Sequence, residues 1–66
     1  MSDHEEAIER LAAELERIAE ELNDVSMSIL ADAIGAGSTE RPATEKKVSQ
    51  ARRAVEKALG HLREPR

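Results

Sequence analysis

Apolar residues in the first half of the chain recur at alternating intervals of three and four positions. This spacing places them on one face of an α-helix and repeats every seven residues, as in helices that pack lengthwise. The residues of this apolar seam are Ile8, Leu11, Leu15, Ile18, Leu22, Val25 and Ile29. Beside the seam runs a line of small residues, each seven apart, which allows another helix to approach closely: Ala12, Ala19, Ser26 and Ala33.

The second half of the chain repeats this rhythm with fewer large residues. Its apolar positions are Val48, Ala51, Val55, either Ala58 or Leu59, and Leu62. Between the two periodic segments stand two glycines and a proline, which interrupt regular structure. The pattern therefore predicts an all-α, antiparallel two-helix hairpin formed by residues 1–66 as a single domain, with a helix over 3–34, a loop over 35–41 and a helix over 42–63.

Residues at the predicted helix ends suit their positions. Ser2 or Asp3 can cap the first helix with a side-chain oxygen, and Gly35 or Gly37 can close it in the left-handed conformation. Pro42 fits the first turn of the second helix, where its missing N–H is not needed, although Thr44 is a competing N-cap.

Two features predict that the hairpin associates with copies of itself. At 1.5 Å per residue the first helix is about ten residues longer than the second, yet the seam continues into the overhanging part. Near the loop a second apolar stripe lies beside the seam, and two stripes imply two partners. We expect a homo-oligomeric bundle of four or more helices, a homodimer or homotetramer, with the interface residues Ile8, Leu11, Leu15, Val25, Met27, Leu30, Ala31 and Ile34.

Composition narrows the possible functions. The 66 residues include no cysteine and no aromatic residue, which excludes disulfides, thiolate chemistry and aromatic stacking on bases. No apolar run is long enough to span a membrane and no signal peptide is evident, so we expect a soluble cytoplasmic protein. The net charge of −4 is the sum of two halves of opposite charge. Residues 1–39 hold two arginines and ten acids, a net charge of −8, whereas residues 40–66 hold eight Lys/Arg and four acids, a net charge of +4.

The acidic helix contains a motif that suggests metal chemistry. Glu5-Glu6-x-x-Glu9 and Glu20-Glu21-x-x-Asp24 resemble the paired acidic signatures of MazG-type nucleotide pyrophosphohydrolases, all-α enzymes whose carboxylates hold magnesium. In those enzymes the motifs lie on neighbouring helices, whereas here one seam runs through both and separates Glu6 from Glu21 by about 22 Å. A solvated helix face is the simpler interpretation, and we predict no metal or other cofactor.

Other polar residues offer weaker signals. Lys46, Arg53 and Lys57 share a basic face that could track phosphates, although the acidic chain makes nucleic-acid binding the less favoured alternative. Asp32 occupies a seam position near the loop, where a lone buried carboxylate is unfavourable, so we expect it to face the second helix N-terminus or Lys46 and Lys47. We expect His61 to lie beside the seam near Leu62.

The second half of the chain also resembles small helical-hairpin proteins of actinobacteria that carry no assigned activity. The resemblance rests on Glu40-Arg41-Pro42, on Lys46 and Lys47, and on the stretch from Ala51 to Ala58. The sequence thus favours a non-enzymatic, self-associating helical hairpin that acts as a structural or protein-interaction module, with another protein as a further possible partner. A MazG-like metal-dependent phosphohydrolase and a nucleic-acid binder through the second helix are the alternatives.

Overall fold

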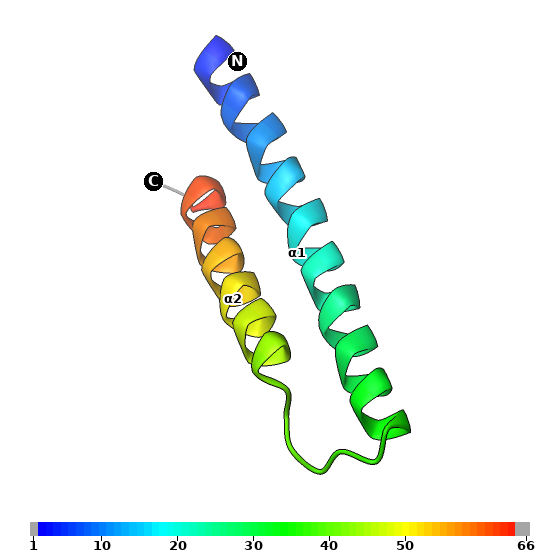
Figure 1. The fold of residues 1–66 in the computed structure, drawn as a ribbon. Helices are drawn as coiled ribbons and strands as arrows, with labels where there is room; N and C mark the ends of the chain where they lie inside the picture. Colours follow the sequence, from blue (N-terminus) through cyan, green and yellow to red (C-terminus); the bar gives the residue numbers. More distant parts are fainter. Residues whose placement is uncertain (1, 65–66) are drawn as a thin grey trace.

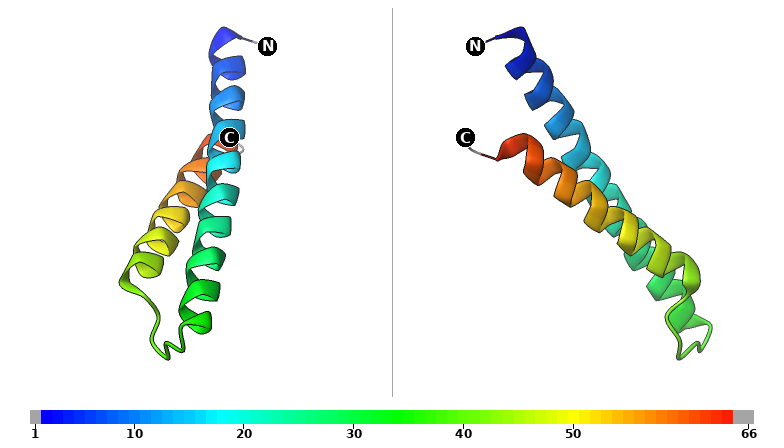
Figure 2. Two further views of the ribbon diagram at one scale, coloured as in Figure 1. Left: turned by 45° about the vertical axis from the view of Figure 1, so that its right-hand side comes forward. Right: turned by 90° about the vertical axis from the view of Figure 1, so that its left-hand side faces the viewer.

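In a computed structural model, which describes residues 2–64, the chain forms an antiparallel helical hairpin 53 Å long and 16 × 13 Å across. Helix α1 runs over Asp3–Gly35 and helix α2 over Ala43–Arg63, so each predicted boundary beside the loop moves by one residue. The two helices lie side by side along the length of α2, and α1 extends beyond it (Figures 1 and 2). The expectation of an all-helical hairpin is confirmed.

The ends of α1 are closed by the interactions that their residue types favour. Ser2 is the N-cap, and its Oγ accepts a hydrogen bond from the Glu5 N–H at 3.1 Å. At the other end Gly37 has φ +81°, the left-handed region that a glycine adopts without a Cβ clash. The Ser38 N–H donates to the Ala33 carbonyl and the Gly37 N–H to the Ile34 carbonyl, which is the Schellman pattern. Of the two predicted capping glycines, Gly37 has this role.

Helix α2 begins differently from the prediction. Pro42 lies just outside the helix as its N-cap, and the Lys46 N–H donates to the Pro42 carbonyl at 3.1 Å. Thr44 lies inside the first turn and does not cap it. The hydrogen bond that a capping hydroxyl usually supplies is absent here, although the acidic Glu45 stands in the first turn, where it suits the helix dipole.

The line of small residues, rather than the apolar seam, forms the centre of the helix contact. Ala12, Ala19 and Ser26 are buried, and Ala33 continues the line half-buried. Seam residues such as Leu15, Ile18 and Leu22 flank this line and are half-buried. The only buried apolar residues within 2–64 are Ala12 and Ala19, so the hairpin has close packing but no core of large side chains.

On α2 the residues that meet α1 differ in part from those predicted. Val48, Val55 and Leu59 are half-buried, but Ala51 and Ala58 are exposed. The contact line instead follows the spacing of three and four through Glu45, Val48, Arg52, Val55, Leu59 and Leu62. Two charged residues, Glu45 and Arg52, therefore occupy contact positions that a search for apolar residues alone does not identify.

Candidate functional site

The largest fully buried side chain among the described residues is a carboxylate. Glu45 is 2% exposed, and it lies between the helices in the first turn of α2. Its Oε1 accepts hydrogen bonds from Ser26 Oγ at 2.7 Å and from Ser49 Oγ at 2.5 Å. Arg41 donates from Nη2 to the same oxygen at 3.1 Å and from Nε to Oε2. Ser26, Arg41, Glu45 and Ser49 together are called the Glu45 cluster below.

The sequence brings these four groups together by simple spacings. Glu45 and Ser49 are one helical turn apart, and so point to the same side of α2. Arg41 lies in the loop four residues before Glu45, and its guanidinium pairs with the Glu45 carboxylate. Ser26 occupies the small-residue line of α1, where its size lets α2 approach until the two serine oxygens lie 3.4 Å apart.

The Glu45 cluster stabilises the charged form of its carboxylate. The hydrogen bond from Arg41, then those from Ser49 and Ser26, lower the pKa of Glu45 from 4.5 to about 2, against the opposing effect of burial. The same contact raises the pKa of the Arg41 guanidinium. Because burying a charge is unfavourable unless hydrogen bonds replace its water, all three donors are needed for Glu45 to sit between the helices.

The chemistry of this cluster suits a structural role. A carboxylate with so low a pKa is a weak base, and both serine hydroxyls donate their hydrogen bonds to it. Ser26 and Ser49 are also buried, so a substrate has no access to their oxygens. The cluster fixes which turn of α1 lies opposite the start of α2.

One long edge of the helix contact is charged. The Arg63 guanidinium donates to Glu16 at 3.1 Å and to Glu9 at 3.3 Å, which ties the end of α2 to the first half of α1. These contacts raise the pKa of Arg63. Arg52 pairs with Glu56 at 3.2 Å on the same edge.

Between these pairs a shallow groove of about 530 Å³ is lined by Glu16, Ala19, Glu20, Asn23, Asp24, Arg52, Glu56 and Leu59. The Nε of Arg52 is buried there and has no hydrogen-bond partner among the described residues. We call this side of the contact the polar edge.

The opposite edge is apolar along its whole length. On α1, the positions just before the buried small residues hold Leu11, Ile18 and Val25, on the side away from Glu9 and Glu16. On α2, the positions turned away from Glu56 and Arg63 hold small and medium apolar residues. The polar edge occupies one side of each helix, so these apolar residues of α1 and α2 lie together on the opposite side of the helix contact. We call this surface the lateral apolar face. Its residues are Leu11, Ile18, Val25, Ala51, Val55, Ala58 and Leu62.

Much of the lateral apolar face is open to solvent. Leu11 and Val25 are each 47% exposed, and Leu62, Ala51 and Ala58 are also exposed. Ile18 and Val55 are half-buried between the helices. Side chains of this kind gain free energy when they leave water, at about 25 cal/mol per Å² of buried apolar surface.

The other residues predicted for an oligomer interface fall into three places. Ile8 is exposed on the part of α1 that extends past α2, and Leu15 is half-buried between the helices. Near the loop, Met27 is 60% and Ile34 is 74% exposed, with Ala31 exposed and Leu30 half-buried beside them. The second apolar stripe of α1 is therefore a separate surface at the loop end of the hairpin.

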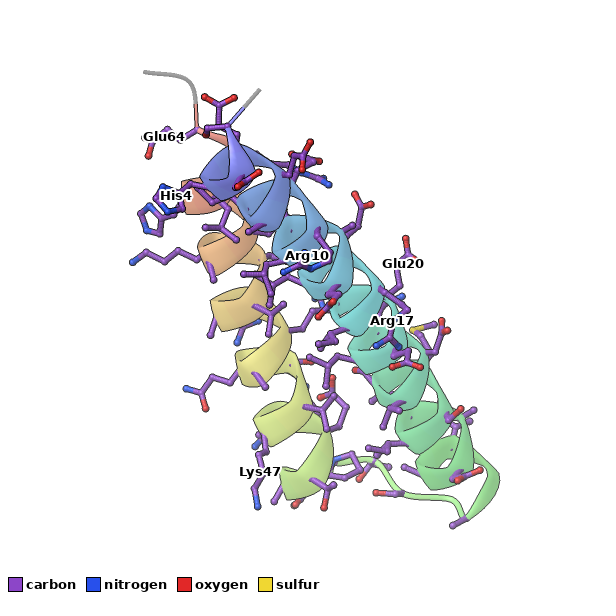
Figure 3. The ribbon with its side chains drawn as sticks, turned by 90° about the horizontal axis from the view of Figure 1, so that it is seen from above. His4, Arg10, Arg17, Glu20, Lys47 and Glu64 are labelled. Carbon is purple, nitrogen blue, oxygen red and sulfur yellow. The ribbon has the colours of Figure 1, made fainter. Side chains whose placement is uncertain are left out.

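The predicted charged surfaces point outward. Lys46, Arg53 and Lys57 are exposed on α2, and none of them pairs with a described acid. Figure 3 shows Lys47 on the outer side of α2 and Glu20 on the outer side of α1. Glu5, Glu6 and Glu9 and the second acidic motif lie at separate heights on α1, and residues 2–64 contain no group of three or more His, Asp or Glu placed to hold a metal ion.

Two sequence-based expectations are wrong. Asp32 is exposed on α1 and its side chain bonds to none of the described residues, because the small-residue line faces α2 and Ala33 of that line takes the place beside Asp32. His61 is exposed and lies 3.8 Å from the Glu64 carboxylate instead of packing beside Leu62.

The Glu45 cluster was not anticipated from the sequence. Glu45 looks like an ordinary first-turn acid, and Arg41 looks like a loop residue. The available signal was the spacing on α2: extending Val48, Val55 and Leu62 by alternating steps of three and four places Glu45, Arg52 and Leu59 on the contact line.

The fold and these surfaces define the protein as a close-packed antiparallel helical hairpin with one charged and one apolar edge. Neither helix within residues 2–64 combines the length and apolar character that crossing a membrane requires. Comparisons with protein-family models, with curated proteins and with solved structures find no match to this chain.

Proposed function

We propose that this protein is a helical self-association module, a non-enzymatic structural or interaction element that pairs through its lateral apolar face. The observation that supports the proposal is the contrast between the two edges of one helix contact. On the polar edge, Arg63 and Arg52 form ion pairs within the hairpin. The lateral apolar face leaves Leu11 and Val25 each 47% exposed and Leu62 36% exposed.

The small interior of the hairpin supports the same conclusion. A helical protein ordinarily buries its large apolar side chains, yet here two alanines are the buried apolar residues of the described chain. A further helical layer on the lateral apolar face would move Leu11, Ile18 and Val25 from the edge of a two-helix contact to the centre of a bundle. Association then supplies the core that one hairpin lacks.

Light scattering coupled to size exclusion tests this proposal at micromolar concentration. The full chain is expected to elute with twice or four times the 7.3 kDa mass of one copy. Val25→Glu puts a charge on the lateral apolar face and is expected to reduce the mass to that of one copy. Ala13→Glu, at an exposed α1 position away from the lateral apolar face, is the matched control and should leave the oligomer intact. A wild-type chain that is stably helical and monomeric overturns the proposal.

A further inference from the structure

We infer that, in the self-associated form proposed above, the acidic α1 of each copy packs on the basic α2 of the other, around a two-fold axis parallel to the helices. This inference rests on the proposed self-association and adds the arrangement of the two copies. Identical faces that cover each other form an isologous pair. A two-fold axis along the helices places α1 on the partner's α2, whereas an axis across them places α1 on the partner's α1.

Charge is the first argument for the axis along the helices. Helix α1 carries ten acids and two arginines, a net charge of −8, and α2 carries six Lys/Arg and two acids, a net charge of +4. Packing α1 on the partner's α1 would bring two helices of −8 together. Packing α1 on the partner's α2 brings opposite charges together along both contacts and makes all neighbouring helices antiparallel.

Side-chain size is an independent argument. On the lateral apolar face α1 presents large residues, Leu11, Ile18 and Val25, whereas the outer positions of α2 are Ala51 and Ala58. If like helices met, large residues would collide along one contact and alanines would leave voids along the other. When α1 meets the partner's α2, large residues lie against small ones and both contacts can close.

The position of each residue along the common direction of the helices, called its height here, identifies which residues of the two copies face each other. Within one hairpin Ser26 lies level with Ser49, and Arg63 reaches both Glu9 and Glu16. Residues of α1 and α2 at the same height therefore have numbers that sum to about 75. A two-fold axis parallel to the helices leaves heights unchanged, so the same rule holds between copies. Ile18 then faces the partner's Ala58, and Val25 faces the partner's Ala51.

Because the chain has no cysteine, single engineered thiols test this arrangement cleanly. Ile18→Cys and Ala58→Cys are made as separate proteins, refolded together from denaturant and oxidised mildly. Each protein is also oxidised alone, after light scattering has confirmed that it remains oligomeric. Pairing within one chain is impossible, because each chain carries one thiol. Ala13→Cys mixed with Ala54→Cys, both exposed outside the face, measures disulfides that form by random collision.

The mixture of Ile18→Cys and Ala58→Cys is expected to form a disulfide-linked dimer well above the collision control, while each protein alone does not. Efficient linkage of Ile18→Cys with itself would show α1 on α1 and overturn the arrangement, although self-association would stand. An oligomer that links in neither sample also overturns it. A monomeric wild-type chain by light scattering removes the proposed function itself, so the two failures are distinguishable.

Discussion

Ser26 Oγ donates a 2.7 Å hydrogen bond to Glu45 Oε1 and so joins the last third of α1 to the first turn of α2. Both residues are buried, and Arg41 and Ser49 complete the shell around the carboxylate. A slide of one helix by a turn would separate these groups and leave a charge without donors between the helices. The Glu45 cluster therefore selects one alignment of the hairpin out of several that a line of alanines would accept.

Replacement of Ser26 by alanine is expected to lower the melting temperature by several degrees, because the buried carboxylate loses one of its hydrogen-bond donors. Thermal unfolding followed by circular dichroism measures the effect. Ser28→Ala, at an exposed position two residues away, is the control and should change little. Equal melting of the two variants would contradict the role given to Ser26.

Stability is expected to fall in acid through Glu45. Its pKa is about 2 in the folded chain against 4.5 for the free side chain, so the folded state holds fewer protons at intermediate pH. The stabilisation is fully present above pH 4.5 and is lost as the pH falls from 4.5 to about 2.

Denaturant unfolding of the wild type and of Glu45→Gln across this range isolates that contribution. The difference in unfolding free energy between the two proteins should shrink toward pH 2. A difference that stays constant with pH would contradict the low pKa of Glu45.

Enlarging Ala19 is expected to destabilise the hairpin by about 1–3 kcal/mol, because a leucine at the centre of the contact forces the helices apart. Ala13→Leu adds the same atoms at an exposed position of α1 and should stay within about 0.5 kcal/mol of the wild type. Urea unfolding of both variants measures the difference. If Ala19→Leu were neutral, close approach along the small-residue line would not be needed for stability.

Gly37→Ala is expected to destabilise the chain by about 1 kcal/mol, since alanine is strained at a φ of +81°. Gly35→Ala is the matched control: Gly35 is helical, and a Cβ there meets no atom within 4 Å. That variant should be neutral or more stable, because alanine favours the helix. The same thermal unfolding experiment compares them, and a reversed order would refute the Schellman closure at Gly37.

Removal of the Arg63 side chain is expected to lower the melting temperature slightly at low salt, through loss of its pairs with Glu9 and Glu16. These groups are largely exposed, so added salt should screen the interaction and abolish the difference from the wild type. Melting of Arg63→Ala at low and high sodium chloride tests this. A large effect that persists at high salt would indicate packing by the arginine stem instead.

The sequence predicts the parts of this fold that depend on neighbouring residues. The helices follow from periodic spacing, the Ser2 cap and the Gly37 turn from local conformational preferences, and the close approach from small residues seven apart. Glu45 could not be recognised in the same way, because its burial depends on Ser26, nineteen positions away, and on Arg41 folding back. The surroundings of Asp32 are mispredicted because the seam only flanks the helix contact, so a residue at a seam position can still be exposed.

The place of the Glu45 cluster beside the loop has a kinetic consequence. Its contact with Ser26 closes a segment of 19 residues, whereas the pair of Arg63 and Glu9 closes one of 54. Closing a short segment costs less chain entropy than closing a long one. The loop end of the hairpin is therefore the favoured place for the first contacts between the helices to form. Folding is then expected to zip from the loop toward the two termini, and the helix ends far from the loop should be the first to fray.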